Sequence, residues 1–249
     1  MFGCWLNVVK SEYMLIGSRF KVSSIGSFAP IEINGSGIEK VSTLKHLGVY
    51  IDQNLNWHTH IDYICKKVGK SIYGLKQIRD FVPLSTLDTM YKALIQPTFD
   101  YCDLVWSNLN KGQAERLQKL QNRAARIITY QGYDVRSADI LQQLNWNKLQ
   151  ERRDERLSLF MFDVLNENCP SYLSNLFKMR SSDSNEYKSK LRGSDQIEMQ
   201  HIPKTDFFRS SFYYRGAKIW NSLPSEIKSA PTKTIFKKSL LRWRTDSAQ

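Results

Sequence analysis

The chain has 249 residues, of which 41% are hydrophobic and 24% charged, a composition typical of a globular protein with one large domain or two smaller ones. It contains no run of 18 apolar residues, which argues against a transmembrane helix, and its first residues lack the basic start and small-residue cleavage site of a secretory signal. Its four cysteines lie far apart with no C-x-x-C pair, so we expect free thiols in an intracellular compartment, cytoplasmic or nuclear.

The net charge is +12 and is unevenly spread along the sequence. Residues 171–249 carry 15 basic and seven acidic side chains, a net charge of +8. A polyanionic partner, most simply nucleic acid, is one interpretation of this excess. A basic surface that only aids solubility is the other, and charge alone does not decide between them.

Short strands are predicted in the first 55 residues, at 12–18, 31–34, 38–41 and 44–52. The stretch Asn34-Gly35-Ser36-Gly37 between two apolar runs predicts a hairpin turn. The last predicted strand, "LKHLGVYID", has Gly48 in its middle. A glycine inside a strand indicates that another backbone or a ligand comes close.

Helical periodicity begins at Asn56, where apolar residues recur every three or four positions and predict a helix of about 24 residues that ends before Pro83. Asn54 or Asn56 is its expected cap. A second helix is expected from Ser85, ended or kinked by Pro97. Further helices are predicted over about 113–129, 147–167, 212–223 and 232–244, with a proline turn and a short helix at 169–177 and a long loop over 178–205. The expected fold class is therefore α+β, a small N-terminal β portion followed by helices.

The predicted helix 113–129 has two stripes. Its apolar arc lies beside a cationic stripe about 80° wide on a helical wheel, formed by Arg116, Lys119, Arg123 and Arg126. The stripe is either a solvated face whose long stems cover apolar surface or a ridge that follows phosphates.

Motifs of complete enzymes are missing from the sequence. It contains no phosphate-binding P-loop, no H-E-x-x-H and no G-x-S-x-G. No two aspartates are adjacent, and Asp100 and Asp103 resemble an ordinary surface pair. His58, His60 and Cys65 are the best zinc-ligand candidates, but their spacing fits zinc poorly. We therefore predict no metal site and no catalytic residue from composition and spacing.

Five blocks, in chain order, resemble the C-terminal part of reverse transcriptases from jockey-like non-LTR retrotransposons. They cover nearly the whole chain and read "LNVVKSEYMLIGSR" (6–19), "VSTLKHLGVYIDQNLNWHTHIDYICKKV" (41–68), "MYKALIQPTFDYCDLVW" (90–106), "RLQKLQNRAARIIT" (116–129) and "SSFYYRGAKIWNSLP" (210–224). The resemblance implies the end of a palm with a primer-grip hairpin over 1–55, a helical thumb over 56–130, and a basic helical extension over 131–249 of unspecified role.

The resemblance also implies roles for single residues. The block that holds Lys10 follows the catalytic strand in this family, and Lys10 would assist departing pyrophosphate in a complete enzyme. Leu47 and Gly48 lie on the segment that is similar to the primer grip, where glycine allows close backbone approach. The cationic stripe of 116–126 would contact duplex phosphates, which favours the phosphate interpretation.

The family's catalytic aspartates are expected before Met1, so polymerisation by this chain alone is not expected. Magnesium belongs to the complete parent enzyme, and no cofactor is expected in this chain. The expected partner is an RNA or DNA template–primer, with no membrane and no small-molecule substrate in the absence of the missing palm. The alternative is a degenerate relic, or a helical interaction module without a nucleic-acid function.

Overall fold

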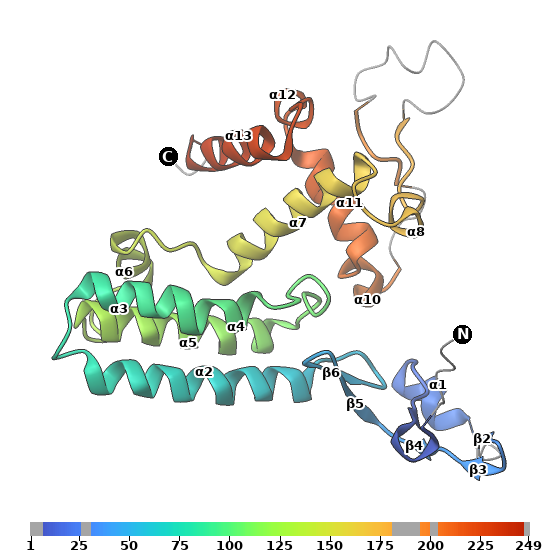
Figure 1. The fold of residues 1–249 in the computed structure, drawn as a ribbon. Coiled ribbons are helices and arrows are strands. Elements are labelled where there is room, and N and C mark those ends of the chain that lie inside the picture. The colour runs from blue at the N-terminus through green and yellow to red at the C-terminus, as the bar shows by residue number, and fades with distance from the viewer. Residues whose placement is uncertain (1–6, 26–30, 181–194, 200–203, 247–249) are drawn as a thin grey trace, which may run out of the picture. The chain divides into compact units, whose positions relative to one another are not determined.

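The computed structural model describes residues 7–25, 31–180, 195–199 and 204–246. The chain forms two compact units (Figure 1). Unit 1 comprises Met1–Phe99 and Leu109–Ile128, and unit 2 comprises Asp100–Asn108 and Thr129–Gln249. Small sheets occur only near the start of the described chain and helices make up most of the rest, which confirms the α+β prediction.

The N-terminal part of unit 1 consists of short elements: η1 (Val8–Lys10), β1 (Glu12–Tyr13), α1 (Arg19–Ser24), β2 (Glu32–Ile33), β3 (Ser36–Gly37), β4 (Glu39–Lys40), β5 (Thr43–His46) and β6 (Val49–Asp52). Strand β1 pairs in parallel with β4, and β2 pairs antiparallel with β3. Asn34 and Gly35, both with positive φ, join β2 to β3, which confirms the predicted hairpin turn. Helix α1 was not expected from the sequence.

The prediction of one strand over 44–52 is wrong. Two antiparallel strands, β5 and β6, occupy this stretch, and His46 pairs with Val49 across a two-residue turn. The turn residues Leu47 and Gly48 have φ values of 44° and 85°, as the favoured hairpin turn with two left-handed central residues requires. Gly48 is therefore present because the turn needs a positive φ, and not because a strand is approached at its middle.

The connection from β6 to the next helix, α2 (His58–Ile78), is held by one carboxylate. Asp52 is 8% exposed, and its carboxylate accepts hydrogen bonds from the backbone amides of Asn54, Asn56 and Trp57, the last at 2.8 Å. The Asn56 side chain accepts from the His58 amide at 3.1 Å. The sequence predicted Asn54 or Asn56 as the cap of this helix, but Asp52, which was not predicted, accepts most of the hydrogen bonds from the backbone amides before the helix.

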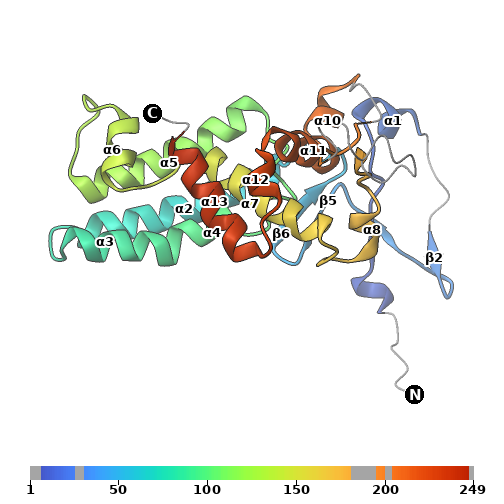
Figure 2. The same ribbon diagram turned by 90° about the horizontal axis from the view of Figure 1, so that it is seen from above.

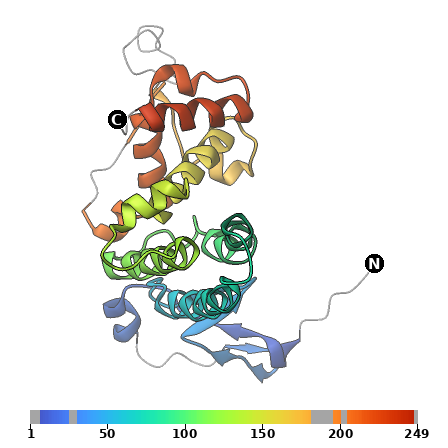
Figure 3. The same cartoon turned by 90° about the vertical axis from the view of Figure 1, so that its left-hand side faces the viewer.

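Three long helical segments form the body of unit 1 (Figures 1 and 3): α2, a second segment built from α3 (Leu84–Met90), η2 (Tyr91–Ile95) and α4 (Gln96–Asp100), and α5 (Lys111–Thr129). Their apolar stripes are buried, with Ile61, Val68, Leu87, Ile95 and Leu117 almost fully covered. The predicted helices at 56, 85 and 113 are confirmed, with α2 somewhat shorter than expected.

Pro97 does not end the second segment, which stays helical from Leu84 to Asp100. A proline inside an α-helix removes one hydrogen bond and clashes with the carbonyl of residue i−4. The turn just before Pro97, Tyr91–Ile95, widens into a π-helix. This wider turn relieves the clash, so the helix continues past the proline that was expected to end or kink it.

Unit 2 contains α6 (Ser137–Gln143), α7 (Leu149–Leu165), α8 (Ser171–Ser174), α10 (Asp206–Arg209), α11 (Phe212–Ser222), α12 (Ser225–Lys228) and α13 (Lys233–Asp246). Figure 2 shows α7 beside α11 and α13, and the apolar residues of these three helices form one core. Gly216 lies where α11 crosses α7, since a Cβ there would stand 2.5 Å from the sulfur of Met161. The predicted helices at 147, 212 and 232 are confirmed.

Residues 100–108 of unit 2 are fastened to α7 by charge. Asp100 accepts from Arg152 at 2.6 Å and from Arg156 at 2.9 Å, and Arg156 also reaches Asp103 at 3.1 Å. The guanidinium of Arg153 lies 5.1 Å from the ring centre of the buried Trp106. The prediction of a surface pair at 100 and 103 is wrong, because both carboxylates anchor this segment. Burial raises the pKa of Asp103.

The predicted loop 178–205 is only partly described, because residues 181–194 and 200–203 lie outside the described ranges. In its described part Met179 forms a bridge to Ile197, whose side chain is fully buried in the core of unit 2. Asn221 holds Ile197 on both sides, since its side chain accepts from the Ile197 amide and donates to the Ile197 carbonyl.

Replacement of Gly48 by Ala is expected to destabilise the hairpin by about 1–2 kcal/mol, because a Cβ at positive φ meets the following carbonyl. Replacement of Leu47 by Asn should stabilise it, because Asn-Gly is the preferred pair for this turn. Urea unfolding followed by circular dichroism measures both. If Gly48→Ala left the unfolding midpoint unchanged, this assignment of the turn would be contradicted.

Replacement of Asp100 by Ala is expected to lower the free energy of unfolding by about 2–3 kcal/mol, because it leaves Arg152 and Arg156 without their shared carboxylate. The matched control is Asp62→Asn, which removes an exposed pair with Arg116 and should cost less than about 1 kcal/mol. The same urea titration compares the two, and equal losses would count against an anchoring role for Asp100.

Candidate nucleic-acid interface

The cationic stripe predicted on 113–129 lies on the solvent side of α5. Leu117, Ala124 and Ile128 are fully buried on one side of this helix. Arg116, Lys119 and Arg123 are exposed, and Arg126 is half-buried. Three residues of α-helix rise by about 4.5 Å, so the four cations cover about 15 Å of the helix axis.

The first cation of the stripe is already engaged within unit 1. The guanidinium of Arg116 donates to the carboxylate of Asp62 on α2 at 2.7 Å, and both side chains are about half exposed. This hydrogen bond raises the pKa of Arg116. Lys119 and Arg123 form no ion pair with any residue in the described part of the chain, so they remain available to an anion in solution.

Helix α2 contributes further cations to the same surface. Arg116 and Asp62 fix the start of α5 beside the start of α2, and the Gln113 side chain donates to the carbonyl of Asn56 at 2.7 Å. The two helices therefore run side by side in the same direction (Figure 1). On α2, Lys66 and Lys70 follow Asp62 at four-residue steps, so they lie on the same face.

We call the exposed cations Lys66, Lys70, Arg116, Lys119 and Arg123 the α2–α5 face. Gly69, between Lys66 and Lys70 in sequence, has no side chain, and no atom lies within 4 Å of the position that its Cβ would take. Unit 1 as a whole carries 16 basic and eight acidic residues, a net charge of +8. Unit 2 carries the remaining +4, because the net charge of +8 on residues 171–249 is offset by −4 on the other residues of that unit.

Leu47 and Gly48 lie at the exposed tip of the β5–β6 hairpin, where Leu47 is 77% exposed. The hairpin is tied to the first turn of α2, because the Tyr50 amide donates to Nδ1 of His60 at 3.3 Å. The hairpin and the first turn of α5 are therefore both attached to the same end of α2. Their predicted contact with a primer stays a prediction.

Lys10, the predicted auxiliary group, ends the single turn η1 and is exposed. Its neighbour in the same block, Leu6, lies outside the described residues. Among the described residues, no side chain forms a hydrogen bond or an ion pair with the Lys10 ammonium group, so the role of Lys10 stays a prediction.

The three zinc-ligand candidates, His58, His60 and Cys65, are not grouped as a metal site. His60 is buried with Nδ1 occupied by the Tyr50 amide, and Nδ1 of His58 lies 3.5 Å from the Gln113 side chain. Cys65 is half-buried, and burial raises its pKa. Across the described ranges, no three His, Cys, Asp or Glu side chains are grouped as metal ligands.

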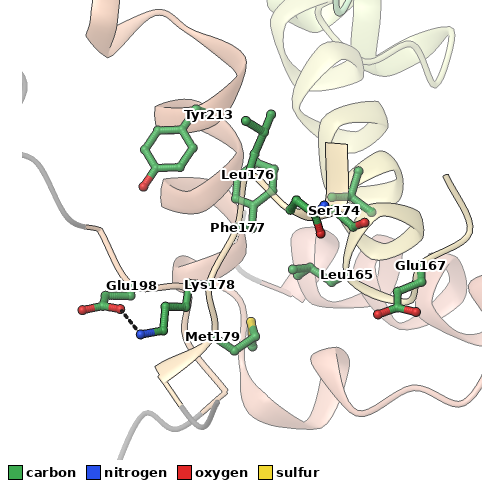
Figure 4. A pocket seen from close by; sticks show the side chains of 11 residues that line it. Leu165, Glu167, Ser174, Leu176, Phe177, Lys178, Met179, Glu198 and Tyr213 are labelled. Atoms are coloured by element: carbon green, nitrogen blue, oxygen red, sulfur yellow. Dashed lines mark ion pairs between the residues drawn. The ribbon is translucent and has the colours of Figure 1, made fainter. Parts of the chain in front are cut away.

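A pocket of about 630 Å³ in unit 2 lies between the end of α7, residues 174–179 and Tyr213 (Figure 4). Its lining includes an ion pair of Lys178 with Glu198 at 3.8 Å. The hydroxyl of Ser174 donates to the Ser171 carbonyl, and no imidazole lines the pocket. This pocket therefore offers no nucleophile with a base beside it.

Among the described residues no helix combines the length and the apolarity that are needed to cross a bilayer.

Comparison with known proteins identifies two transposon proteins of Drosophila melanogaster. The chain is 27% identical over 135 residues to a probable RNA-directed DNA polymerase from transposon BS, and 26% identical over 155 residues to a probable RNA-directed DNA polymerase from transposon X-element. The matches cover 53% and 61% of this chain but 15% and 16% of those relatives, so the chain spans about a sixth of their length.

No family model and no solved structure matches the chain. The resemblance to transposon reverse transcriptases is confirmed at the level of sequence similarity by these two relatives. The jockey-like type and the position of the chain within a polymerase stay predictions.

The contact between the β5–β6 hairpin and α2, in which the Tyr50 amide donates to His60, is expected to weaken in mild acid. Burial lowers the pKa of His60 below its ordinary value of about 6.5. The unfolded chain therefore takes up the proton first, so stability falls as the pH drops through about 6.5 and levels off below the folded-state pKa.

Thermal unfolding of the full chain at pH 7.5 and 5.5 measures this loss. The variant His60→Gln keeps an acceptor for the Tyr50 amide but cannot titrate, so its midpoint should fall less over this interval. Equal falls in the variant and the native chain would show that another group is responsible.

Proposed function

We propose that the chain is the nucleic-acid-binding, C-terminal part of a jockey-like non-LTR retrotransposon reverse transcriptase. In this proposal unit 1 grips a template–primer through the α2–α5 face, and the β5–β6 hairpin corresponds to the primer grip. The observation that carries the proposal is that Lys119 and Arg123 point away from a buried helix face and form no ion pair with a described residue. Similarity to two transposon polymerases supports it.

The arrangement suits contact with a phosphate backbone more than reading of bases. Lysine and arginine side chains on a smooth helical surface neutralise phosphates without regard to sequence. The five side chains that define the face are all cations, and the nearby carboxamides of Gln118, Gln121 and Asn122 on α5 are hydrogen-bonded to one another. Binding is therefore expected to be independent of sequence and to weaken steeply with salt.

Polymerisation itself would need metal-binding carboxylates. The sequence contains no adjacent aspartates. We propose that the chain positions nucleic acid and that any polymerase activity depends on carboxylates supplied by a fuller protein, with magnesium. Its place of action would be the cytoplasm or nucleus, where free thiols such as Cys65 and Cys102 persist.

Neutralisation of the face tests the proposal. The double variant Lys119→Gln/Arg123→Gln should bind an RNA–DNA duplex at least about tenfold more weakly at low salt, because each lost phosphate contact removes a released counterion. The control Lys21→Gln/Lys40→Gln removes the same charge from exposed positions outside the face. Fluorescence anisotropy with a labelled 16-base-pair duplex measures both.

A gain-of-binding variant makes the test sharper. Asp62→Asn frees the guanidinium of Arg116 and removes a negative charge from the face, so it should tighten duplex binding. If the native chain bound no duplex, or if the face variants and the controls were indistinguishable, a relic or an interaction module without a nucleic-acid function would be favoured instead.

A further inference from the structure

A second pocket in unit 2 has a chemistry that the proposed duplex grip does not use. It lies where α6 ends, α7 begins and α13 ends, and its volume is about 590 Å³. This volume is in the usual range for small-ligand sites. Leu141 and the nearly buried Trp146 supply its apolar floor, and most of its other lining side chains are polar.

The backbone of this pocket is held at both ends. Asn145, two residues beyond the end of α6, adopts the left-handed conformation at φ 53°. The Asn145 amide donates to the Gln142 carbonyl at 3.0 Å and the Trp146 amide to the Leu141 carbonyl at 2.8 Å, the two bonds of a Schellman cap. Lys148 is the residue just before α7, and its amide donates to the Glu151 carboxylate at 2.9 Å. The connecting segment is therefore preformed, which lowers the entropic cost of binding.

Three carboxamide side chains line the pocket: Gln142, Asn145 and Asn147. Gln142 and Asn145 are exposed, and their side chains make no hydrogen bond to a described residue. A carboxamide offers one acceptor and two donor hydrogens in a plane. This pattern matches the edges of nucleobases, and Asn or Gln pairs with adenine in this bidentate way.

Cations approach the pocket along the exposed side of α13. Thr245 lines the pocket, and Arg242 and Lys238 lie on the same side of the helix, about one and two turns earlier. Both are exposed and form no ion pair with a described residue. In contrast, Lys233 on the same helix is paired with Asp163.

The Glu151 carboxylate also lines the pocket, where it caps α7. A phosphate would be repelled from this position, whereas a neutral base would not. The lining therefore separates two parts of a nucleotide: carboxamides and an apolar floor for the base inside, and the cations of Lys148 and α13 for phosphate at the rim.

We propose that this α6–α7–α13 pocket binds an unstacked nucleobase whose phosphate lies against Lys148 and α13. The ligand is a nucleotide, either free or at a frayed or single-stranded part of a longer strand. The site lies within unit 2 and does not depend on the α2–α5 face of unit 1. The chain would then recognise bases in one unit and bind duplex phosphates in the other.

Mononucleotides test the site directly. AMP, GMP, CMP and UMP are titrated into the full chain by isothermal calorimetry, with ribose 5-phosphate as the ligand that has the phosphate but lacks the base. At least one nucleotide should bind about fivefold or more tightly than ribose 5-phosphate, the discrimination expected from one bidentate base contact. Equal binding of all five ligands, or no binding, would overturn the proposal.

The matched variant is Gln142→Ala/Asn145→Gly, which removes two carboxamides. Glycine accepts the left-handed conformation at position 145 and alanine suits a helix, so the fold and its melting temperature should be retained. The variant should lose the preference for nucleotides over ribose 5-phosphate. A preserved preference in a folded variant would overturn the proposal.

A competition arm distinguishes the two sources of the base. A ten-nucleotide single strand that displaces the bound nucleotide would identify strands as ligands, whereas failure to displace would identify free nucleotides. The variant Lys119→Gln/Arg123→Gln in unit 1 should bind nucleotides normally. If the native chain binds duplex but no nucleotide, only the present inference is contradicted. If it binds nucleotides but no duplex, only the proposed duplex grip is contradicted.

Discussion

The carboxylate of Asp52 is the constraint on which the arrangement of unit 1 depends. Three backbone amides of the β6–α2 connection converge on it, and this fixes the direction in which α2 leaves the hairpin. His60 in the first turn of α2 accepts a hydrogen bond from the Tyr50 amide of the hairpin, and Asn56, just before α2, accepts one from the Gln113 side chain of α5. The exposed hairpin tip and the cations of α5 are thereby attached to one rigid helix end.

Helix α5 shows how the same residues serve stability and the candidate interface. Burial of Leu117, Ala124 and Ile128 orients the helix, and the opposite side is then left to Lys119 and Arg123. Their charges cost little in stability because they remain hydrated. In unit 2, by contrast, Arg152 and Arg156 form ion pairs with Asp100 that anchor residues 100–108. A cluster of basic residues in a sequence can thus belong to a binding surface or to a structural anchor.

Helices with strong periodicity, such as α2, α5 and α7, could be predicted from the sequence because one face of each meets a core. The residue pattern alone predicted one strand where the Leu47-Gly48 hairpin lies, because the flanking residues continue an apolar pattern across the turn, whereas the family resemblance implied a hairpin in this region. The α helix through Pro97 was missed because a π-turn, invisible in the pattern, removes the clash. Asp100 gave no signal, since its arginine partners lie more than 50 residues away.

The candidate sites show the same division. The stripe on α5 was predictable because helical spacing alone places its four cations together, whereas their companions on α2 depend on a helix–helix contact fixed by Gln113 and by Arg116 with Asp62. The carboxamide pocket was not predictable at all. It needs the Schellman cap at Asn145 and the end of α13, which is about 100 residues distant in sequence.

The central claim is that the α2–α5 face binds a phosphate backbone, and the salt dependence of duplex binding by the native chain tests it most directly. Each neutralised phosphate contributes about −0.9 to the slope of log K against log salt concentration. Contacts by Lys66, Lys70, Lys119 and Arg123 predict a slope of about −3 to −4 between 50 and 200 mM salt. A slope near zero, or no measurable binding at the lowest salt concentration, would contradict the account.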